Sequence, residues 1–158
     1  MTVPHTGPPV AAPDVDAAID ALRARGLRVS AARRLVLEAL YAAGAPISAE
    51  QIADGLAGRL PRSDLASVYR NLETLEEVGL VRHRHLGHGP GLYSHAGLDE
   101  LEYLVCDSCS TVKAVDRKAM DPVRNLIQRR FGYEARFSHF PILGLCAECA
   151  REESQDPT

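Results

Sequence analysis

The chain has four cysteines, and they form two Cys-x-x-Cys pairs far apart in the sequence, Cys106 with Cys109 and Cys146 with Cys149. Two such pairs supply four thiolates, the ligand number and donor type of a tetrahedral structural zinc site. A metal ion shared by the pairs would connect the beginning of a domain to its end. A redox-active dithiol pair and four unrelated buried cysteines are the alternatives. Because four thiolates fill the coordination shell of zinc, the pattern predicts a structural metal, one per subunit.

The length of 158 residues allows two small domains, and a hydrophobic content of 46% is typical of a globular protein. The sequence has neither a long apolar run nor a charged-then-apolar amino terminus, which predicts no membrane span and no secretory signal. We therefore expect a cytoplasmic protein, because a reducing compartment also keeps thiols available for metal. The net charge is -3, but the acidic excess lies mainly in residues 91–158.

Apolar spacing in the first half predicts a series of helices followed by a hairpin. Ser30 is suited to cap the second helix, and Ser48 with Gln51 fits a capping box at the start of the third. Helices followed by a hairpin are typical of a winged helix-turn-helix domain, whose last helix enters the major groove of DNA. The helices are expected at residues 14–26, 30–44, 48–61 and 63–79, and the hairpin at residues 80–93.

The second half predicts a small α/β domain that carries the cysteines. Strand-like segments lie around residues 102–105, 111–115 and 134–145, and a helix is expected from Pro122 to Phe131. The predicted fold class is therefore α+β. The expected division is a disordered tail at residues 1–13, a winged-helix domain at 14–89, a hinge at 90–97, an α/β domain at 98–150 and a second tail at 151–158.

The outward face of the fourth predicted helix is a candidate DNA-reading surface. Ser67, Tyr69 and Arg70 lie outside the apolar stripe of this helix. Arginine reads guanine edges or phosphates, and tyrosine contacts a thymine methyl group or a phosphate. Arg28 could reach a minor groove, and Arg33 could hold a phosphate at a helix start. A solvated helix face and ordinary surface arginines are the alternatives.

Together these motifs resemble the ferric uptake regulator family of metal-dependent transcription factors, from about Ala17 to Cys149. The resemblance implies a homodimer that binds a double-stranded DNA operator through an amino-terminal winged-helix domain. It implies a carboxy-terminal α/β dimerisation domain with a structural zinc on the four cysteines, and a separate regulatory metal near the hinge. It also places Tyr69 and Arg70 at DNA-reading positions and Arg28 at a minor-groove position. The residues that carry the resemblance are Gly26-Leu27-Arg28-Val29-Ser30, Ser67-Val68-Tyr69-Arg70-Asn71-Leu72, Gly79-Leu80-Val81 and the two Cys-x-x-Cys pairs, with Leu104-Val105 before the first and Gly144 before the second.

The regulatory site departs from the pattern that the resemblance implies. The family carries histidine ligands just before the first Cys-x-x-Cys pair, where this chain has Leu101 and Tyr103. A further expected ligand, before the third helix, is replaced by Pro46. Three losses from one site predict that the main sensing site of the family is absent or rebuilt.

A second group of histidines resembles the nickel-responsive branch of the family. His83 and His85 lie two residues apart on one predicted strand of the hairpin, and His139 lies on a late strand of the other domain. The resemblance implies that these three histidines bind nickel and fix the angle between the domains. Imidazole donors suit nickel, zinc, copper and iron(II) alike, so donor type does not select the metal. Alternatively, His83 and His85 face solvent or DNA phosphate, and His139 is an ordinary strand histidine.

An accessory cation site is a further implication of the resemblance. Glu100, Glu102 and Asp121 align with ligands in some relatives, and with His139 they would suit a hard cation such as manganese or magnesium. The alternative is that Asp121 caps a helix and that the two glutamates are exposed strand charges.

The sequence thus predicts a dimeric, zinc-containing transcriptional repressor whose DNA affinity responds to a transition metal, with nickel expected. Repression is an implication of the resemblance. An alternative within the family binds DNA constitutively, or responds to zinc, iron, manganese or peroxide. An enzyme is not expected, because no nucleophile with a partnered base stands out. A zinc-stabilised interaction module that does not bind DNA is a third class.

Overall fold

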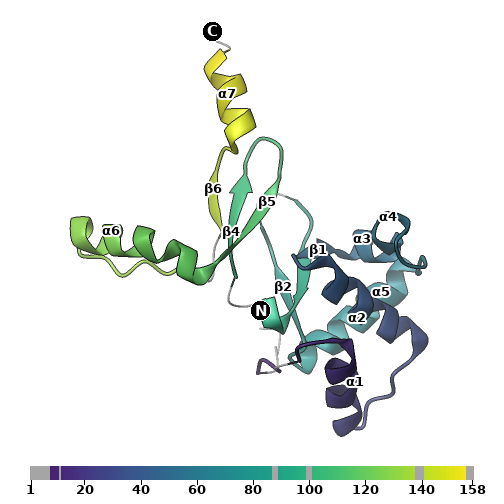
Figure 1. The fold of residues 1–158 in the computed structure, drawn as a ribbon. Coiled ribbons are helices and arrows are strands. Elements are labelled where there is room, and N and C mark those ends of the chain that lie inside the picture. Colours follow the sequence, from purple (N-terminus) through teal and green to yellow (C-terminus); the bar gives the residue numbers. More distant parts are fainter. Residues whose placement is uncertain (1–7, 11, 87–88, 99–100, 138–140, 156–158) are drawn as a thin grey trace, which may run out of the picture. The chain divides into compact units, whose positions relative to one another are not determined.

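The computed structural model describes residues 8–10, 12–86, 89–98, 101–137 and 141–155 (Figure 1). The chain divides into two compact units, Met1–Arg84 with Gly91–Leu98, and His85–Pro90 with Asp99–Thr158. An amino-terminal unit of helices and a carboxy-terminal unit built on a small sheet confirm the predicted α+β class. Among the described residues, no helix combines the length and apolar composition needed to cross a bilayer.

The first unit packs helices around a buried apolar core beside a three-stranded antiparallel sheet in the order β1-β3-β2. Helices α2 and α5 contribute fully buried side chains such as Leu37, Leu40 and Leu72 to this core. Its elements are α1 (Val15–Ala24), α2 (Ala31–Ala43), β1 (Ile47–Ser48), α3 (Ala49–Ala53), α4 (Gly55–Gly58), α5 (Leu65–Glu77), β2 (Val81–Arg84), β3 (Leu92–His95) and the 3-10 helix η1 (Ala96–Leu98).

Side-chain caps fix where these helices begin, because each cap satisfies a backbone N–H that has no partner within the helix. The Ser30 hydroxyl accepts from the backbone N–H of Arg33 at the start of α2. Ser48 and Gln51 form the predicted capping box of α3. The cap of α5 is Asp64, one residue later than the predicted Ser63, because the Asp64 carboxylate accepts from Ser67 N–H.

A left-handed turn interrupts the third predicted helix. Residues Gly55, Leu56, Ala57 and Gly58 have φ values of 71°, 53°, 57° and 86°. The Leu60 N–H donates to the Gly55 carbonyl at 2.8 Å and closes the turn. A Cβ atom on Gly55 would lie 2.1 Å from the Leu60 carbonyl oxygen, so only glycine fits there. This backbone, and not the predicted continuous helix at residues 48–61, connects α3 to α5.

Replacing Gly55 with alanine is expected to destabilise the first unit by about 2–4 kcal/mol, since the left-handed conformation and the backbone overlap both disfavour a Cβ atom. Urea denaturation followed by circular dichroism measures this loss. Gly26→Ala is the matched control, because Gly26 also has a φ of +72° but a Cβ atom added there would meet nothing within 4 Å. Equal losses in the two variants would mean that residues 60–61 move aside without cost.

The predicted amino-terminal tail is partly built into the first unit. The Val10 N–H donates to the Gly79 carbonyl at 3.1 Å, and the Tyr41 hydroxyl donates to the Ala12 carbonyl at 2.7 Å. Ala12 is buried, and burial raises the pKa of Tyr41 to about 12, helped by the Asp14 carboxylate. Residues 1–7 lie outside the described part of the chain.

The second unit is a three-stranded sheet in the order β5-β4-β6, with β5 antiparallel and β6 parallel to β4. Of the predicted strand at residues 134–145, the described part forms a strand only at β6. Helix α6 of the second unit ends at Gly132, which adopts the left-handed conformation that glycine allows without steric cost. The elements are β4 (Leu101–Cys106), β5 (Val112–Asp116), the 3-10 helix η2 (Arg117–Met120), α6 (Asp121–Phe131), β6 (Ile142–Gly144) and α7 (Ala147–Gln155).

Two predicted boundaries differ from the observed elements. β3 occupies residues 92–95 of the predicted hinge, because these residues pair with both β1 and β2. The chain passes between the units at residues 84–85, 90–91 and 98–99 instead. Helix α7 continues to Gln155, into the tail predicted at 151–158, since Ala150, Arg151 and the glutamates after them are strong helix formers.

Candidate metal centre and nucleic-acid surface

Strand pairing in the second unit brings the two cysteine pairs together. Cys106 ends β4 and lies opposite Gly144 of the parallel strand β6, which places Cys146 just beyond it. The turn after β4 carries Cys109, and Ser110 adopts φ +62° as the turn closes. Cys149 lies in the first turn of α7. The pairing of β4 with β6 therefore makes one cluster from residues about 40 positions apart.

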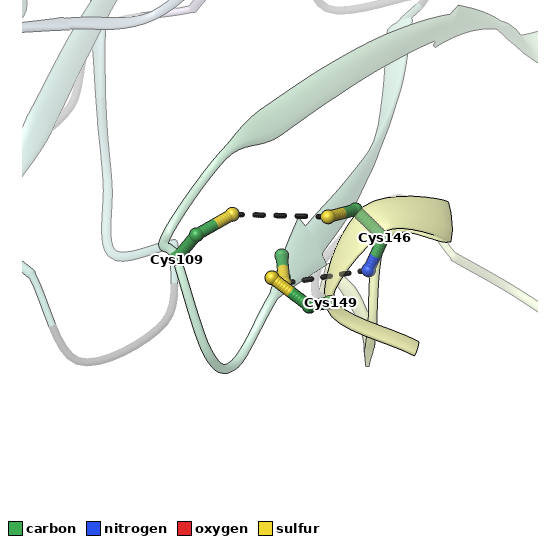
Figure 2. A group of neighbouring side chains, drawn as sticks. Cys109, Cys146 and Cys149 are labelled. Carbon is green, nitrogen blue, oxygen red and sulfur yellow. Dashed lines mark hydrogen bonds between the residues drawn. The ribbon is translucent and has the colours of Figure 1, made fainter. Parts of the chain in front are cut away.

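The cluster has the dimensions of a tetrathiolate metal site. The four sulfur atoms lie within 4.8 Å of one another, and the Sγ atoms of Cys109 and Cys146 are 3.9 Å apart. Figure 2 shows these two sulfurs facing each other, with Cys149 close by. Zinc–sulfur bonds of about 2.3 Å in a tetrahedron require sulfur–sulfur distances of about 3.8 Å. The four cysteines thus fit a zinc ion that they would enclose completely.

The surroundings of Cys106 and Cys109 favour the thiolate form that a metal requires. The backbone N–H groups of Cys109 and Cys146 lower the pKa of Cys106 to about 6, and Cys146 N lies 3.3 Å from its Sγ. Thr111 lowers the pKa of Cys109, whose Sγ is 3.0 Å from the Thr111 hydroxyl. Ser108 lowers the pKa of Cys149, but the sulfurs of Cys146 and the other pair raise it to about 12. All four thiols can ionise together only when a cation is bound between them.

Helix α5 presents the predicted DNA-reading residues on its outward face. Arg70 is exposed, Tyr69 is 43% exposed, and Ser67 is half-buried. The Tyr69 hydroxyl donates to the Glu50 carboxylate at 3.1 Å, and this hydrogen bond raises the pKa of Tyr69. Tyr69 therefore stays protonated, and Glu50 of α3 fixes the position of its hydroxyl. Sequence reasoning missed Glu50, which carries no signal beyond its place inside the capping box of α3.

Arg33 belongs to a network that fixes the position of α5. Its Nε donates to the Asn71 side-chain oxygen at 3.1 Å, and its Nη1 donates to the Arg28 carbonyl at 2.7 Å. Asn71 is buried and donates to the Ser67 carbonyl at 2.9 Å. Arg33 thus connects α2, α5 and the segment that carries the exposed Arg28. The guanidinium of Arg33, which the sequence predicts to bind a phosphate, thus makes hydrogen bonds within the protein.

The candidate sensing histidines are described only in part. The His83 ring stacks on Tyr93, its partner across β2 and β3, with centroids 4.5 Å apart and an interplanar angle of 6°. A Cβ atom on Gly91 would lie 2.2 Å from His83 Nε2, so Gly91 leaves room for the imidazole. His85 is exposed just after β2. His139 lies outside the described residues.

The positions that depart from the family pattern are occupied by a tyrosine, a proline and a leucine. Tyr103 is 4% exposed in β4, Pro46 is buried before β1, and Leu101 is half-buried at the start of β4. Side chains of this kind pack into their surroundings and offer no imidazole or carboxylate to a metal ion.

Two predicted accessory ligands, Glu102 and Asp121, both contact Arg124. Glu102 is 3% exposed and forms an ion pair with Arg124, whose Nη1 also lies 3.0 Å from the Asp121 carboxylate. Asp121 begins α6 without capping it, because Met120 is the N-cap residue and makes no side-chain bond. Glu100 lies outside the described residues. The sequence prediction missed Arg124, although its spacing of three residues from Asp121 on a helix is a usable signal.

The fold and the four-cysteine centre together define a zinc-binding α+β protein with a separate helical unit. Residues 24–139 match the model of the Ferric uptake regulator family, and the chain belongs to this family. Its members are transcription regulators and not enzymes.

Several named relatives illustrate the match. The peroxide operon regulator of Bacillus subtilis (strain 168) is 27% identical over 145 residues, which cover 92% of this chain and 99% of that protein. The ferric uptake regulator Fur of Helicobacter pylori has a similar fold, with a TM-score of 0.65 at 18% identity over 86% of this chain and 93% of that chain. A zinc uptake regulator complexed with zinc and DNA has a TM-score of 0.52 at 25% identity, over 89% of this chain and 95% of that one. These names refer to peroxide, iron and zinc, and not to nickel.

Proposed function

We propose that this protein is a DNA-binding transcriptional repressor that acts as a homodimer and responds to a divalent transition metal. The outward face of α5 carries the proposal, because it places Ser67, Tyr69 and Arg70 together on a helix whose other face is buried. Arg70 would read a base edge or a phosphate, and the ring of Tyr69 would contact a thymine methyl group. The solved complex of a zinc uptake regulator with zinc and DNA supports this assignment by similarity.

Exposed apolar side chains of the second unit support the proposed homodimer. None of the side chains of α6 (residues 121–131) is buried. The apolar side chains of Val123, Leu126 and Phe131 are 41%, 48% and 74% exposed. Leu143 and Leu145, at and beyond β6, are also exposed. A second copy of this unit would bury these side chains, as the family resemblance implies. The four cysteines would hold one zinc ion in each subunit and stabilise this unit.

The proposed metal response is assigned to His83, His85 and His139. The stacking of His83 on Tyr93 fixes the orientation of one imidazole on the hairpin of the DNA-binding unit. Metal binding would favour the conformation that binds DNA by the difference in metal affinity between the two conformations. Nickel is the proposed effector, because three imidazoles suit nickel and the pattern resembles the nickel-responsive branch of the family.

Double replacement of His83 and His85 by alanine is expected to remove the metal response while leaving the zinc-loaded fold intact. Fluorescence anisotropy would measure binding to DNA from upstream of its own gene with nickel, iron(II), manganese, added zinc or chelator. Wild-type protein should bind at least tenfold more tightly with nickel than with chelator, a difference of about 1.4 kcal/mol. The variant should show a ratio near one. His5→Ala is the control that removes a histidine outside the proposed set.

The second candidate function is a regulator that responds to peroxide, favoured by the 27% identity to the Bacillus subtilis regulator over 92% of the chain. In the same experiment, hydrogen peroxide added to the metal-loaded protein would then release DNA, with iron(II) rather than nickel as the supporting metal. Equal binding in all conditions, chelator included, would indicate a constitutive DNA-binding member of the family.

A further inference from the structure

The second unit buries the side-chain carboxylate of Glu102. Glu102 lies near the start of the central strand β4, opposite Val115 of β5, and is 3% exposed. Moving an ionised carboxylate out of water is unfavourable unless a positive charge or several hydrogen-bond donors accompany it. Proteins supply this compensation either with a bound metal ion or with a cationic side chain.

The compensating charge at Glu102 is the guanidinium of Arg124, which reaches the sheet from α6. Its Nη2 contacts Glu102, while its Nη1 donates to the Asp121 carboxylate at 3.0 Å and to the Arg117 carbonyl at 2.8 Å. The guanidinium carbon also lies 5.4 Å from the centroid of the Phe137 ring. Side-chain exposure of 17% confirms that Arg124 is largely withdrawn from water. One cation therefore holds two carboxylates, a backbone carbonyl and an aromatic face.

We propose that Arg124 is an internal cation that replaces a divalent metal ion between Glu102 and Asp121. The carboxylates that the sequence suggested as accessory ligands are neutralised by this guanidinium and do not bind a hard cation. A metal ion entering there would have to displace the guanidinium, which remains charged at all accessible pH values and repels a dication. Within the described residues, the pair of carboxylates Glu102 and Asp121 therefore does not fit the accessory metal.

The replacement has a structural consequence within the second unit. Arg124 connects α6 to β4 and to η2, and this connection does not depend on the supply of a metal ion. A divalent ion in the same position would make the attachment of α6 vary with metal concentration. The zinc centre is consequently the structural metal site of this unit, and Arg124 supplies the counter-charge of the buried Glu102. This inference is independent of the proposed function.

Thermal unfolding of the zinc-loaded full chain tests the inference, with and without excess Ca²⁺ or Mg²⁺, which prefer oxygen ligands. The wild-type melting temperature is expected to be the same in all these conditions. Arg124→Met should melt roughly 10 °C lower, because it leaves Glu102 buried without a counter-charge. Excess Ca²⁺ should raise the melting temperature of this variant, since both carboxylates become free to bind it.

The double variant Glu102→Gln with Arg124→Met removes both charges and keeps the test valid if Arg124→Met does not fold. It should regain much of the loss and should not respond to Ca²⁺. Arg136→Met is the matched control, because Arg136 lines the same pocket as Glu102 and Arg124 but is 75% exposed and pairs with Glu134 at 3.4 Å. The proposal is overturned if Ca²⁺ or Mg²⁺ stabilises the wild type through Glu102, so that Glu102→Gln abolishes the effect. The proposal is also overturned if Arg124→Met melts at the same temperature as the wild-type protein.

Discussion

Replacing Cys109 with serine, or removing zinc with a strong chelator, is expected to unfold the second unit. Structural zinc sites contribute about 10–16 kcal/mol, which matches or exceeds the total stability of a small domain, about 5–15 kcal/mol. Apolar burial in this unit is limited, because no side chain of α6 or of the described residues 147–155 of α7 is fully buried. Circular dichroism and a zinc assay should show loss of one zinc ion per subunit together with loss of sheet signal.

The first unit should remain folded in this experiment, because its core lies among its own helices and strands. The zinc-loaded protein should show two melting transitions and the zinc-free protein only one, that of the first unit. Asp107→Asn is the matched control, since Asp107 lies in the same turn and contributes its backbone N–H to the Gly144 carbonyl at 2.8 Å. A zinc-free protein with an unchanged second transition would refute the structural role of the metal.

Replacing Arg70 with alanine is expected to weaken operator binding roughly 30-fold or more. A bidentate contact to a guanine contributes about 1–3 kcal/mol, and a homodimer loses one contact in each subunit. If Arg70 instead binds a phosphate, affinity falls on all sequences and the salt dependence becomes shallower by about one counterion per subunit. Anisotropy titrations against the operator and a scrambled duplex, at several salt concentrations, distinguish the two roles.

Arg23→Ala provides the control for the loss of a positive charge. Arg23 lies on α1, and its side chain is 67% exposed and pairs only loosely with Asp20 at 3.9 Å. The first unit should keep its stability in both variants, because neither arginine is buried. If the Arg70 variant binds its operator as tightly as the wild-type protein does, α5 is not the DNA-reading helix.

The metal centre and most helix starts could be predicted from the sequence, because their chemistry is local or restrictive. Few residues can hold zinc, so two Cys-x-x-Cys pairs leave little choice of partner. The caps at Ser30 and Ser48 follow from hydroxyls placed before apolar periodic segments. These features depend on a few side chains and their immediate neighbours.

Other features depend on contacts that the sequence does not display. Leu56 and Ala57 are good helix formers, yet the left-handed turn places them at positive φ between two glycines. Glu102 and Arg124 look like surface charges in the sequence, and only the fold brings the Arg124 guanidinium against the buried Glu102. The contact of Tyr69 with Glu50 joins α5 to α3 through two residues that are 19 positions apart in the sequence. Tertiary packing decides all three cases.

The parallel pairing of β4 with β6 also has a consequence for biosynthesis. The first unit is complete in sequence by Leu98, whereas Cys106 has to wait for Cys146, which follows it by 40 residues. At about 5–20 residues per second on the ribosome, this interval lasts roughly 2–8 s. The nascent chain therefore carries one thiol pair without its partner during that time, and a metal ion can be bound by all four cysteines only after Cys149 has been synthesised.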